Sequence, residues 1–559
     1  MKRKKSILRR DFLKSNLLAA TGLTISGGAT LSLTNCADKN YQSNNSNLRS
    51  IRTKNYSIEE MVFASRKLRE MIISDRQRPC YHIMHPEGFH NDVNGLQYWN
   101  GRYHMFYLGR TPIPDTPDRP ENDDWIGRVW QHISSADLIH WIHHPAALEA
   151  PPDGTTNRGP QSGSAIANAP VPTLIYHWGE QGTYIATCED DDLINWKPLT
   201  GNPVIPIPEN DAEYVVFDPC AWYDKNNLTY YALIGNKNKR QGFEGDCTSL
   251  FKSSNLTEWE YVGPFYKSSR DWTGEEEDAA CPDFFPLGGK YILLMHGHQP
   301  YTNCHYYIGT YENEKFYPEK HGRMNWPGGQ LGGPETFLDE KGRRIFFGWI
   351  PEAQGRDWKK YGWASTISLP RILTLTKDDI LEINPAEELK SLRNNYRHKE
   401  SIHVNSDTEI TLEDIRGDTM EIIAEIESLG AKEYGIKVRC SPNGDEETSI
   451  LYLPFYEVIK VGLEKSTLDN TIQYTVGTGE SIKVLSSQEA PLHLLPGENL
   501  KLRIFMDRSV LEIFANGRQC LTQRIYPTRV DSIGIKLFSK RGDVLVRSFD
   551  AWDMLATSC

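Results

Sequence analysis

Several features that would place this chain in other classes of protein are missing. No run of basic residues follows position 14, and the net charge is −12, which argues against a nucleic-acid partner because phosphate backbones attract clustered lysine and arginine. The ten cysteines include no Cys-x-x-Cys pair, and no histidine group carries a metal-ligand pattern, so no metal is predicted. A glycine-rich phosphate loop is also lacking, and no cofactor is implied.

The first 36 residues (1–36) have the pattern of an export signal and are set aside from the fold. Residues 9–14, Arg-Arg-Asp-Phe-Leu-Lys, resemble a twin-arginine signal. The apolar run over 17–33 contains several glycines and makes a poor membrane span. Residues 33–36 resemble a lipoprotein processing site at which Cys36 is acylated, and ordinary signal cleavage nearby is the alternative. The chain is therefore expected in the periplasm or at the cell surface, anchored to the membrane by lipid.

The rest of the sequence divides by its pattern into two β-rich parts. Residues 37–75 are expected to form a tether and a short helix, which we place over 58–73. From 76 to 384, short aromatic and β-branched runs alternate with Gly, Pro, Asn and Asp, as in many short strands. A short helical linker is expected within 385–400. Evenly spaced alternating strands over 401–559 indicate a β-sandwich.

A short repeat within the first part predicts its architecture. Leu-x-x-Trp occurs three times, ending at Trp141, Trp196 and Trp259, with spacings of 55 and 63 residues. Periods of this length with several strands each are typical of the blades of a β-propeller. We expect each copy to be a turn whose tryptophan is buried between neighbouring blades.

Three acidic segments lie in turns where a propeller exposes its central pocket. Glycoside hydrolysis uses two carboxyl groups, so acids in such turns are candidates for that chemistry. Asp92 stands between two asparagines and close to Gly95, and Asp218 ends an apolar run before a proline. The acidic run 275–278 leads into an apolar strand, where repulsion and partial burial would raise carboxyl pKa values. The alternatives are an Asx-rich turn, an ordinary strand end and a solvated acidic loop.

Together these segments resemble glycoside hydrolase family 32, the invertases, levanases and inulinases. The resemblance extends over nearly the whole chain beyond residue 80, and its matches follow the family's order. They are Asn91-Asp92-Val93-Asn94-Gly95, Ser162-Gly163-Ser164-Ala165, Asp218-Pro219, Cys281-Pro282-Asp283, Gly333-Pro334-Glu335-Thr336-Phe337, Leu369-Pro370-Arg371, and Asp507-Arg508-Ser509-Val510-Leu511-Glu512-Ile513-Phe514. The resemblance implies an all-β fold, a five-bladed β-propeller followed by a C-terminal β-sandwich, and a retaining enzyme that acts on fructose-containing oligo- or polysaccharides.

The resemblance also implies a role for each matching residue. Asp92 would be the nucleophile, and Asp218 would bind fructose hydroxyls and stabilise the oxocarbenium-like transition state. Asn91, Ser162 and Glu335 would bind substrate. The sandwich carries no predicted chemistry, and the sequence does not choose between packing on the propeller, a second sugar site and dimerisation.

The chain departs from the family pattern around these residues. Ala280 occupies the place of the acid/base glutamate, and Phe217 replaces an arginine; Val93, Gln161 and Leu108 are further departures.

Side chains two apart on a strand share a face, so we expect Asp278 to take the acid/base role, with Glu277 and Glu335 as alternatives. A displaced acid implies a displaced leaving group. A glycosidase or fructosyl transferase acting on an unusual fructoside, and a fructan-binding lipoprotein without catalysis, are the competing interpretations.

Overall fold

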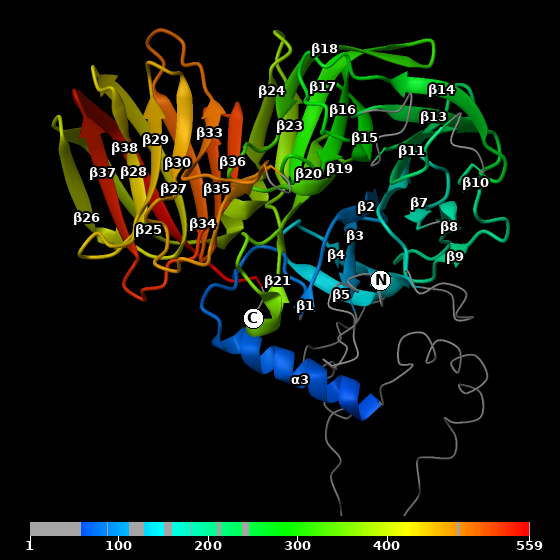
Figure 1. Cartoon of the computed structure of the whole chain (residues 1–559), viewed down its shortest axis with the longest axis horizontal. Helices are drawn as coiled ribbons and strands as arrows, with labels where there is room; N and C mark the ends of the chain where they lie inside the picture. The colour runs from blue at the N-terminus through cyan, green and yellow to red at the C-terminus, as the bar shows by residue number, and fades with distance from the viewer. Residues whose placement is uncertain are drawn as a thin grey trace, which may run out of the picture.

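The computed structural model describes residues 58–86, 88–110, 128–149, 159–179, 181–208, 214–236, 245–477 and 481–557. Cys36 and the rest of the predicted export signal lie outside them. Figure 1 shows two β-rich bodies side by side, a ring of small sheets in blue to green and a two-layered sandwich in yellow to red. The prediction of an all-β propeller followed by a β-sandwich is confirmed.

Helices are scarce in the described residues. The helix predicted over 58–73 is α3 (Ile58–Ser74), which packs against the short α4 (Trp358–Tyr361) beneath the propeller (Figure 1). Within the described ranges, no helix combines the length and apolar character needed to cross a bilayer.

The propeller consists of five antiparallel blades that follow one another along the chain. Strand β1 (Gly88–Phe89) pairs with β21 (Trp363–Ala364) outside them. Blade 1 contains β2 (Val93–Trp99), β3 (Arg102–Arg110), β4 (Arg128–Ser135) and β5 (Trp141–Leu148). Blade 2 contains β6 (Gly163–Ala167), β7 (Thr173–Trp178), β8 (Gly182–Thr187), β9 (Lys197–Pro198) and β10 (Ile205–Pro206). Blade 3 contains β11 (Pro219–Asp224), β12 (Thr229–Ile234), β13 (Thr248–Ser253) and β14 (Glu260–Tyr266). Blade 4 contains β15 (Ala280–Leu287), β16 (Lys290–Gly297), β17 (Asn303–Glu312) and β18 (Lys315–Arg323). Blade 5 contains β19 (Gly332–Leu338), β20 (Arg344–Ile350), β22 (Thr366–Ile367), β23 (Arg371–Leu375) and β24 (Leu381–Pro385).

The first strands of the blades surround the propeller axis. Contacts run from β2 to β6, β11, β15 and β19 and back to β2, which closes the ring. Strands β6 and β11 also pair in parallel and join blades 2 and 3 into one sheet. Residues at the starts of these inner strands can therefore meet at one end of the axis.

The Leu-x-x-Trp repeat forms the same turn in blades 1, 2 and 3. In each copy the leucine adopts a positive φ and its carbonyl accepts a hydrogen bond from the indole N–H of the tryptophan three residues later. The φ angles are 66°, 56° and 68° at Leu138, Leu193 and Leu256, and the hydrogen bonds are 3.1, 2.8 and 2.9 Å. Trp196 packs against Phe106 of blade 1, and Trp141 against Phe347 of blade 5. The predicted burial between blades is confirmed for Trp196, whereas Trp141 is only partly buried against the neighbouring blade.

The sandwich consists of two six-stranded sheets. A 3₁₀ helix, η1 (Glu387–Leu392), connects it to the propeller, and its first strand begins at Arg393, inside the segment expected as linker. The first sheet contains β25 (Arg393–Val404), β38 (Asp543–Met554), β27 (Thr419–Leu429), β34 (Leu500–Asp507), β35 (Val510–Ala515) and β36 (Gln519–Arg524). The second contains β26 (Thr408–Arg416), β37 (Gly534–Lys540), β28 (Glu433–Cys440), β29 (Thr448–Leu453), β30 (Val458–Gly462) and β33 (Ser487–Pro491); β31 (Thr475–Val476) pairs separately with β32 (Lys483–Val484).

A buried ionic network fastens the sandwich to the propeller. Asp507 accepts hydrogen bonds from the backbone N–H groups of residues 80, 81 and 82 and lies 2.8 Å from Nδ1 of His82. The other ring nitrogen of His82 lies 3.2 Å from Glu512, which Arg371 also engages at 2.7 Å. The side chains of these four residues are completely buried. Asp507 and Glu512, the two acids of the 507–514 motif, therefore serve the contact between the two bodies, which identifies propeller packing as one function of the sandwich.

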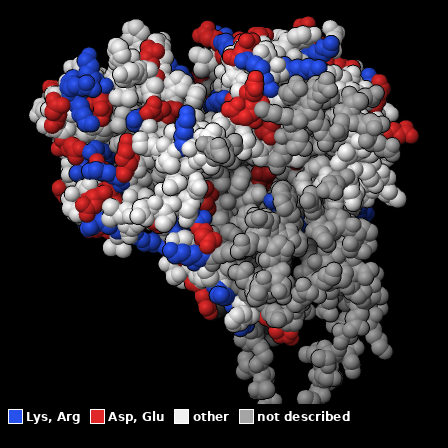
Figure 2. Space-filling model, viewed as in Figure 1, with Lys and Arg blue, Asp and Glu red and all other residues white. Residues whose placement is uncertain are grey.

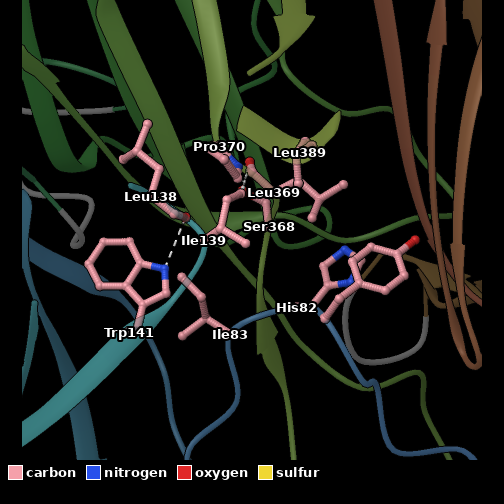
Figure 3. A pocket seen from close by; sticks show the side chains of 10 residues that line it. His82, Ile83, Leu138, Ile139, Trp141, Ser368, Leu369, Pro370 and Leu389 are labelled. Atoms are coloured by element: carbon pink, nitrogen blue, oxygen red, sulfur yellow. Dashed lines mark hydrogen bonds between the residues drawn. The ribbon is translucent and has the colours of Figure 1, made fainter. Parts of the chain in front are cut away.

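The small pocket beside this network is lined by none of the predicted catalytic side chains. Figure 3 shows the pocket, where His82, Trp141 and Leu369 come together from three separate segments. On the face drawn in Figure 2, lysine and arginine are interspersed with aspartate and glutamate over the sandwich. The described side chains on that face thus form no broad basic surface.

Candidate active site

Asp92 lies in a tightly held turn just before the inner strand of blade 1. The N–H of Asn91 donates to the carbonyl of Leu108 at 2.8 Å, and the N–H of Leu108 donates to the carbonyl of Asp92 at 3.0 Å. The Asn94 amide also donates to that carbonyl at 2.9 Å, and its oxygen accepts the N–H of Gly163 at 2.9 Å. The amide at 94 therefore fixes the turn that carries Asp92 to the inner strand of blade 2.

The two neighbouring positions confirm that the turn is closely packed. Gly95 has φ +61°, and a Cβ there would lie 2.6 Å from the ring of Phe106, so the sharp turn needs glycine. With its amide oriented to donate to the carbonyl of His90, the side-chain oxygen of Asn91 accepts from the guanidinium of Arg128 at 3.3 Å. Asn91 is thus placed beside the nucleophile candidate, while its predicted contact with substrate stays a prediction.

The carboxylate of Asp92 is held by groups from blades 2, 4 and 5. The hydroxyl of Ser162 donates to Oδ2 of Asp92 at 2.6 Å, and Sγ of Cys281 lies 3.8 Å from the same oxygen. Gly333, at φ +49°, passes so close that a Cβ would lie 2.6 Å from the carboxylate. Ser162, predicted to bind substrate, therefore has a direct positioning contact with Asp92.

Asp218 reaches the same place from the start of the inner strand of blade 3. Its carboxylate is buried, and its Oδ2 lies 3.4 Å from Sγ of Cys281. Burial, followed by the negative charges of Asp218 and Asp92, raises the pKa of Cys281 well above its usual value, so the thiol stays protonated and donates. Both carboxylates predicted for catalysis are thus brought together, with the thiol between them.

Asp278 lies before the inner strand of blade 4 and is engaged on both oxygens. Its Oδ1 accepts the backbone N–H of His298 at 2.8 Å, and its Oδ2 lies 3.0 Å from the ring Nδ1 of the same residue. The strand itself begins only at Ala280, with an irregular register up to Asp283 and a positive φ of 41° at Cys281. Simple alternation along a strand therefore does not govern where the Asp278 side chain points.

Glu277 is committed to an ion pair with blade 4. Both carboxylate oxygens lie 2.8 Å from guanidinium nitrogens of Arg323, and the N–H of Gly274 also donates to one of them. Burial alone would raise the pKa of Glu277, but the bidentate arginine outweighs it and the pKa is lowered. The expectation that repulsion raises the pKa throughout the acidic run is wrong at this residue.

Glu335 ties the inner strands of three blades together. From blade 5, its oxygens accept the N–H of Leu96 in blade 1 at 3.0 Å and the N–H of Ala165 in blade 2 at 3.3 Å. Burial raises its pKa well above the usual glutamate value. These contacts give Glu335 a structural task, and its predicted contact with substrate stays a prediction.

Two histidines that the sequence reasoning passed over belong to the site. His296 stands directly across from Ala280 in the strand register, and its Nδ1 accepts the N–H of Gly333 at 3.3 Å. The ring of His298 stacks on it, with centroids 4.4 Å apart. The ring of Phe217 lies 6.3 Å from that of His298. The detectable signal was His-Gly-His at the end of a predicted strand.

Asp92, Cys281 and His296 each bring one atom of a metal-ligating type to within 4.8 Å of the other two. A cation held there would occupy the Asp92 oxygen needed for attack on a sugar. Burial also raises the pKa of the Cys281 thiol, whereas a metal ligand must be the thiolate. The three residues therefore fit one wall of a sugar pocket better than a metal centre.

Gly333→Ala is expected to impair the site without removing any reactive group. The new Cβ would lie 2.6 Å from the Asp92 carboxylate and would sit at a left-handed φ, so Asp92 must move. A displacement of about 1 Å costs on the order of 10²-fold in rate. Steady-state kinetics should show this loss in kcat, and Gly342→Ala, at an open turn with φ +73°, is the control. An unchanged kcat would contradict the described packing.

Comparison with known proteins agrees with this geometry. The family model described as "Glycosyl hydrolases family 32 N-terminal domain" matches residues 82–385, and "Glycosyl hydrolases family 32 C terminal" matches residues 388–553. Sucrose-6-phosphate hydrolase of Zymomonas mobilis is 27% identical over 529 residues, covering 88% of this chain and 95% of that protein. Levanase of Bacillus subtilis is 27% identical, covering 87% and 72%.

Solved structures show the same fold. Fructan 1-exohydrolase IIa from Cichorium intybus superposes with a TM-score of 0.73 at 22% identity, covering 87% of this chain and 98% of that one. Exo-inulinase from Aspergillus awamori gives a TM-score of 0.69 at 22% identity, covering 87% and 99%. The arrangement of a propeller followed by a sandwich is thus shared with these proteins.

Proposed function

Because the chain belongs to family 32 of the glycosyl hydrolases, we propose that it hydrolyses terminal β-fructofuranosidic bonds with retention of configuration. The observation that supports this most directly is the meeting of Asp92 and Asp218 around Cys281 at one end of the propeller axis. A retaining glycosidase needs one carboxylate to attack and further groups to stabilise the charge that develops on the sugar. Relatives named for action on sucrose 6-phosphate and levan agree with a fructose-containing substrate.

In the proposed reaction, a carboxylate oxygen of Asp92 attacks the anomeric carbon as the glycosidic bond breaks. The Ser162 hydroxyl holds Oδ2, which orients the carboxylate toward the sugar. Asp218 places a second negative charge beside the ring as oxocarbenium character develops. Water then cleaves the fructosyl–Asp92 ester and releases fructose with the original anomeric configuration.

The test is release of fructose from sucrose, inulin, levan and an aryl fructoside, comparing the native protein with Asp92→Asn. Fructose that appears with the native protein and not with the variant supports the proposal. Tight binding without release would instead identify a fructan-binding protein. Transfer of fructosyl units to a second sugar, in preference to water, would identify a transferase.

Asp218→Asn is expected to lower kcat on the order of 10²- to 10³-fold, as when one preorganised electrostatic contact to a transition state is removed. The substitution keeps the shape of the side chain and removes its negative charge. Asp224→Asn, at the far, partly exposed end of the strand that follows Asp218, is the matched control and should retain native kinetics. An effect confined to KM would show that Asp218 binds the substrate and the transition state equally.

We also propose that the chain is exported and held at the membrane by a lipid on Cys36. The support is the Arg-Arg-Asp-Phe-Leu-Lys segment followed by Leu-Thr-Asn-Cys in the sequence. Expression of Cys36→Ala should move the protein from the membrane fraction to the soluble fraction. A variant that stays with the membrane would rule out the acylated anchor.

A further inference from the structure

Among the described residues, each of the three carboxyl groups predicted as proton donors is engaged by other groups of the protein. Ala280, which stands in place of the expected glutamate, is completely buried and has only a methyl side chain. Glu277 is paired with Arg323, Glu335 accepts two backbone N–H groups, and Asp278 is engaged on both oxygens by His298. Hydrolysis of an ordinary glycoside still requires protonation of the leaving oxygen.

We propose that His298 is the general acid and general base of this enzyme, with Asp278 as its positioning residue. This inference rests on the proposed fructosidase function and names the group that protonates the leaving oxygen. His298 follows strand β16 immediately, and about a third of its side chain (31%) remains exposed, whereas the Asp278 side chain is 11% exposed. With Nδ1 turned to the carboxylate, Nε2 is the nitrogen available to substrate.

Two series of contacts connect His298 with the nucleophile. In the first, Sγ of Cys281 lies 3.8 Å from Asp92 and 3.4 Å from Asp218. Phe217 precedes Asp218 in the chain, and its ring centroid lies 6.3 Å from that of His298.

The second series of contacts runs through His296. Its ring stacks on His298 at 4.4 Å, and one of its nitrogens lies within 4.8 Å of an Asp92 oxygen. The proposal requires that a fructoside attacked by Asp92 presents its leaving oxygen to Nε2 of His298.

The hydrogen bonds assign different tasks to the two histidines. Nδ1 of His296 accepts the N–H of Gly333, an arrangement that a doubly protonated ring could not keep. The partner of Nδ1 in His298 is a carboxylate, which fixes the orientation of the ring. His298 is therefore oriented for proton transfer at Nε2, whereas Nδ1 of His296 is engaged as an acceptor.

The reaction needs no reagent other than water, because the proton that His298 gives up in the first step is restored in the second. In the first step Nε2 of His298 gives its proton to the glycosidic oxygen as the bond to the anomeric carbon breaks and Asp92 forms an ester with that carbon. The leaving sugar departs as a neutral alcohol. In the second step neutral His298 takes a proton from water, the water oxygen attacks the anomeric carbon, and Asp92 recovers its electron pair.

The test compares His298→Ala with the native protein on sucrose-type substrates and on an aryl fructoside whose leaving group needs no protonation. Loss of a general acid typically costs about 10²- to 10⁴-fold. We expect a loss of that size in kcat/KM for unactivated substrates and a much smaller loss for the aryl fructoside. Azide should restore turnover of the aryl substrate by attacking the fructosyl enzyme and giving fructosyl azide.

His140→Ala is the matched control, because His140 also has a ring nitrogen on an aspartate, 2.8 Å from Asp137, but stands on the exposed surface. Suppose that the native protein releases fructose, and that His298→Ala loses activity equally on both kinds of substrate or on neither. The inference is then wrong, while the proposed function stands. If the native protein releases no fructose, the proposed function itself fails. The same leaving-group pattern in Asp283→Asn would assign the acid to Asp283, whose pKa burial raises to about 6.

Asp278→Asn tests the positioning role separately. Among the described residues, the titratable groups in contact with His298 are Asp278 and His296, so the substitution removes the carboxylate that faces the ring. Turnover of unactivated substrates should fall more than turnover of the aryl fructoside, because the ring that donates the proton loses the contact that orients it. Equal losses on the two substrates would contradict the positioning role.

Discussion

Asp92→Asn should abolish fructose release from every substrate, including activated fructosides. Without the carboxylate no covalent intermediate can form, and loss of a nucleophile costs on the order of 10⁶-fold where it has been measured by substitution. The asparagine keeps the size of the side chain and can still accept the Ser162 hydroxyl on its oxygen, so the pocket should remain folded. Steady-state assays with an aryl fructoside give the widest range for this measurement.

Two controls separate chemistry from folding in that experiment. Ser162→Ala removes the 2.6 Å hydrogen bond to Asp92 but leaves the nucleophile, so a partial loss is expected. Asp190→Asn, in the turn of the blade 2 repeat, should leave catalysis intact, because its carboxylate accepts backbone N–H groups far from the axis. Residual activity in Asp92→Asn equal to that of Ser162→Ala would mean that Asp92 is not the nucleophile.

Asp507→Ala should destabilise the protein by about 3–5 kcal/mol, the usual cost of removing one partner from a buried ion pair. The substitution leaves Glu512 as the remaining acidic partner of His82 and deprives three backbone N–H groups, two of them buried, of their acceptor. Urea unfolding measures the change. Asp531→Ala, which removes an exposed partner of Arg529, should leave the unfolding midpoint nearly unchanged. Equal midpoints for the two variants would show that the network does not couple sandwich to propeller.

The same network predicts how stability depends on pH. Burial alone would lower the pKa of His82, but its hydrogen bonds to Asp507 and Glu512 outweigh burial and raise it. The contribution of His82 is therefore fully present below the ordinary histidine pKa of about 6.5 and is lost as pH rises through the folded-state value. The difference in unfolding free energy between native protein and His82→Gln should be larger near pH 5.5 than near about pH 9. A difference independent of pH would contradict a charged His82.

The propeller could be predicted from sequence because its signal is local and repeated. Each Leu-x-x-Trp copy needs only a leucine at positive φ and a tryptophan whose indole returns to the leucine carbonyl, and both lie within four residues. The turn that carries Asp92 is local in the same way, since Gly95 permits it and Asn94 holds it. Local chemistry of this kind can be recognised without knowing which strands become neighbours.

The proton donor could not be predicted because it depends on contacts across strands. The expectation for Asp278 assumed regular alternation, but the strand begins at Ala280 and Cys281 interrupts its register. His298 reaches Asp278 only through the pairing of β15 with β16. Likewise, the burial of His82 with Asp507 joins residues more than 400 positions apart. Only the folded chain brings these groups together.

The most direct test of the account is to trap the covalent intermediate. The native protein is mixed with an aryl fructoside, quenched in acid during turnover, digested and examined by mass spectrometry. The account predicts a peptide containing Asp92 that carries one additional anhydrofructose unit, and fructose released with retained anomeric configuration. Release of the inverted anomer without an adduct, or an adduct on a peptide carrying Asp218 instead, would contradict it.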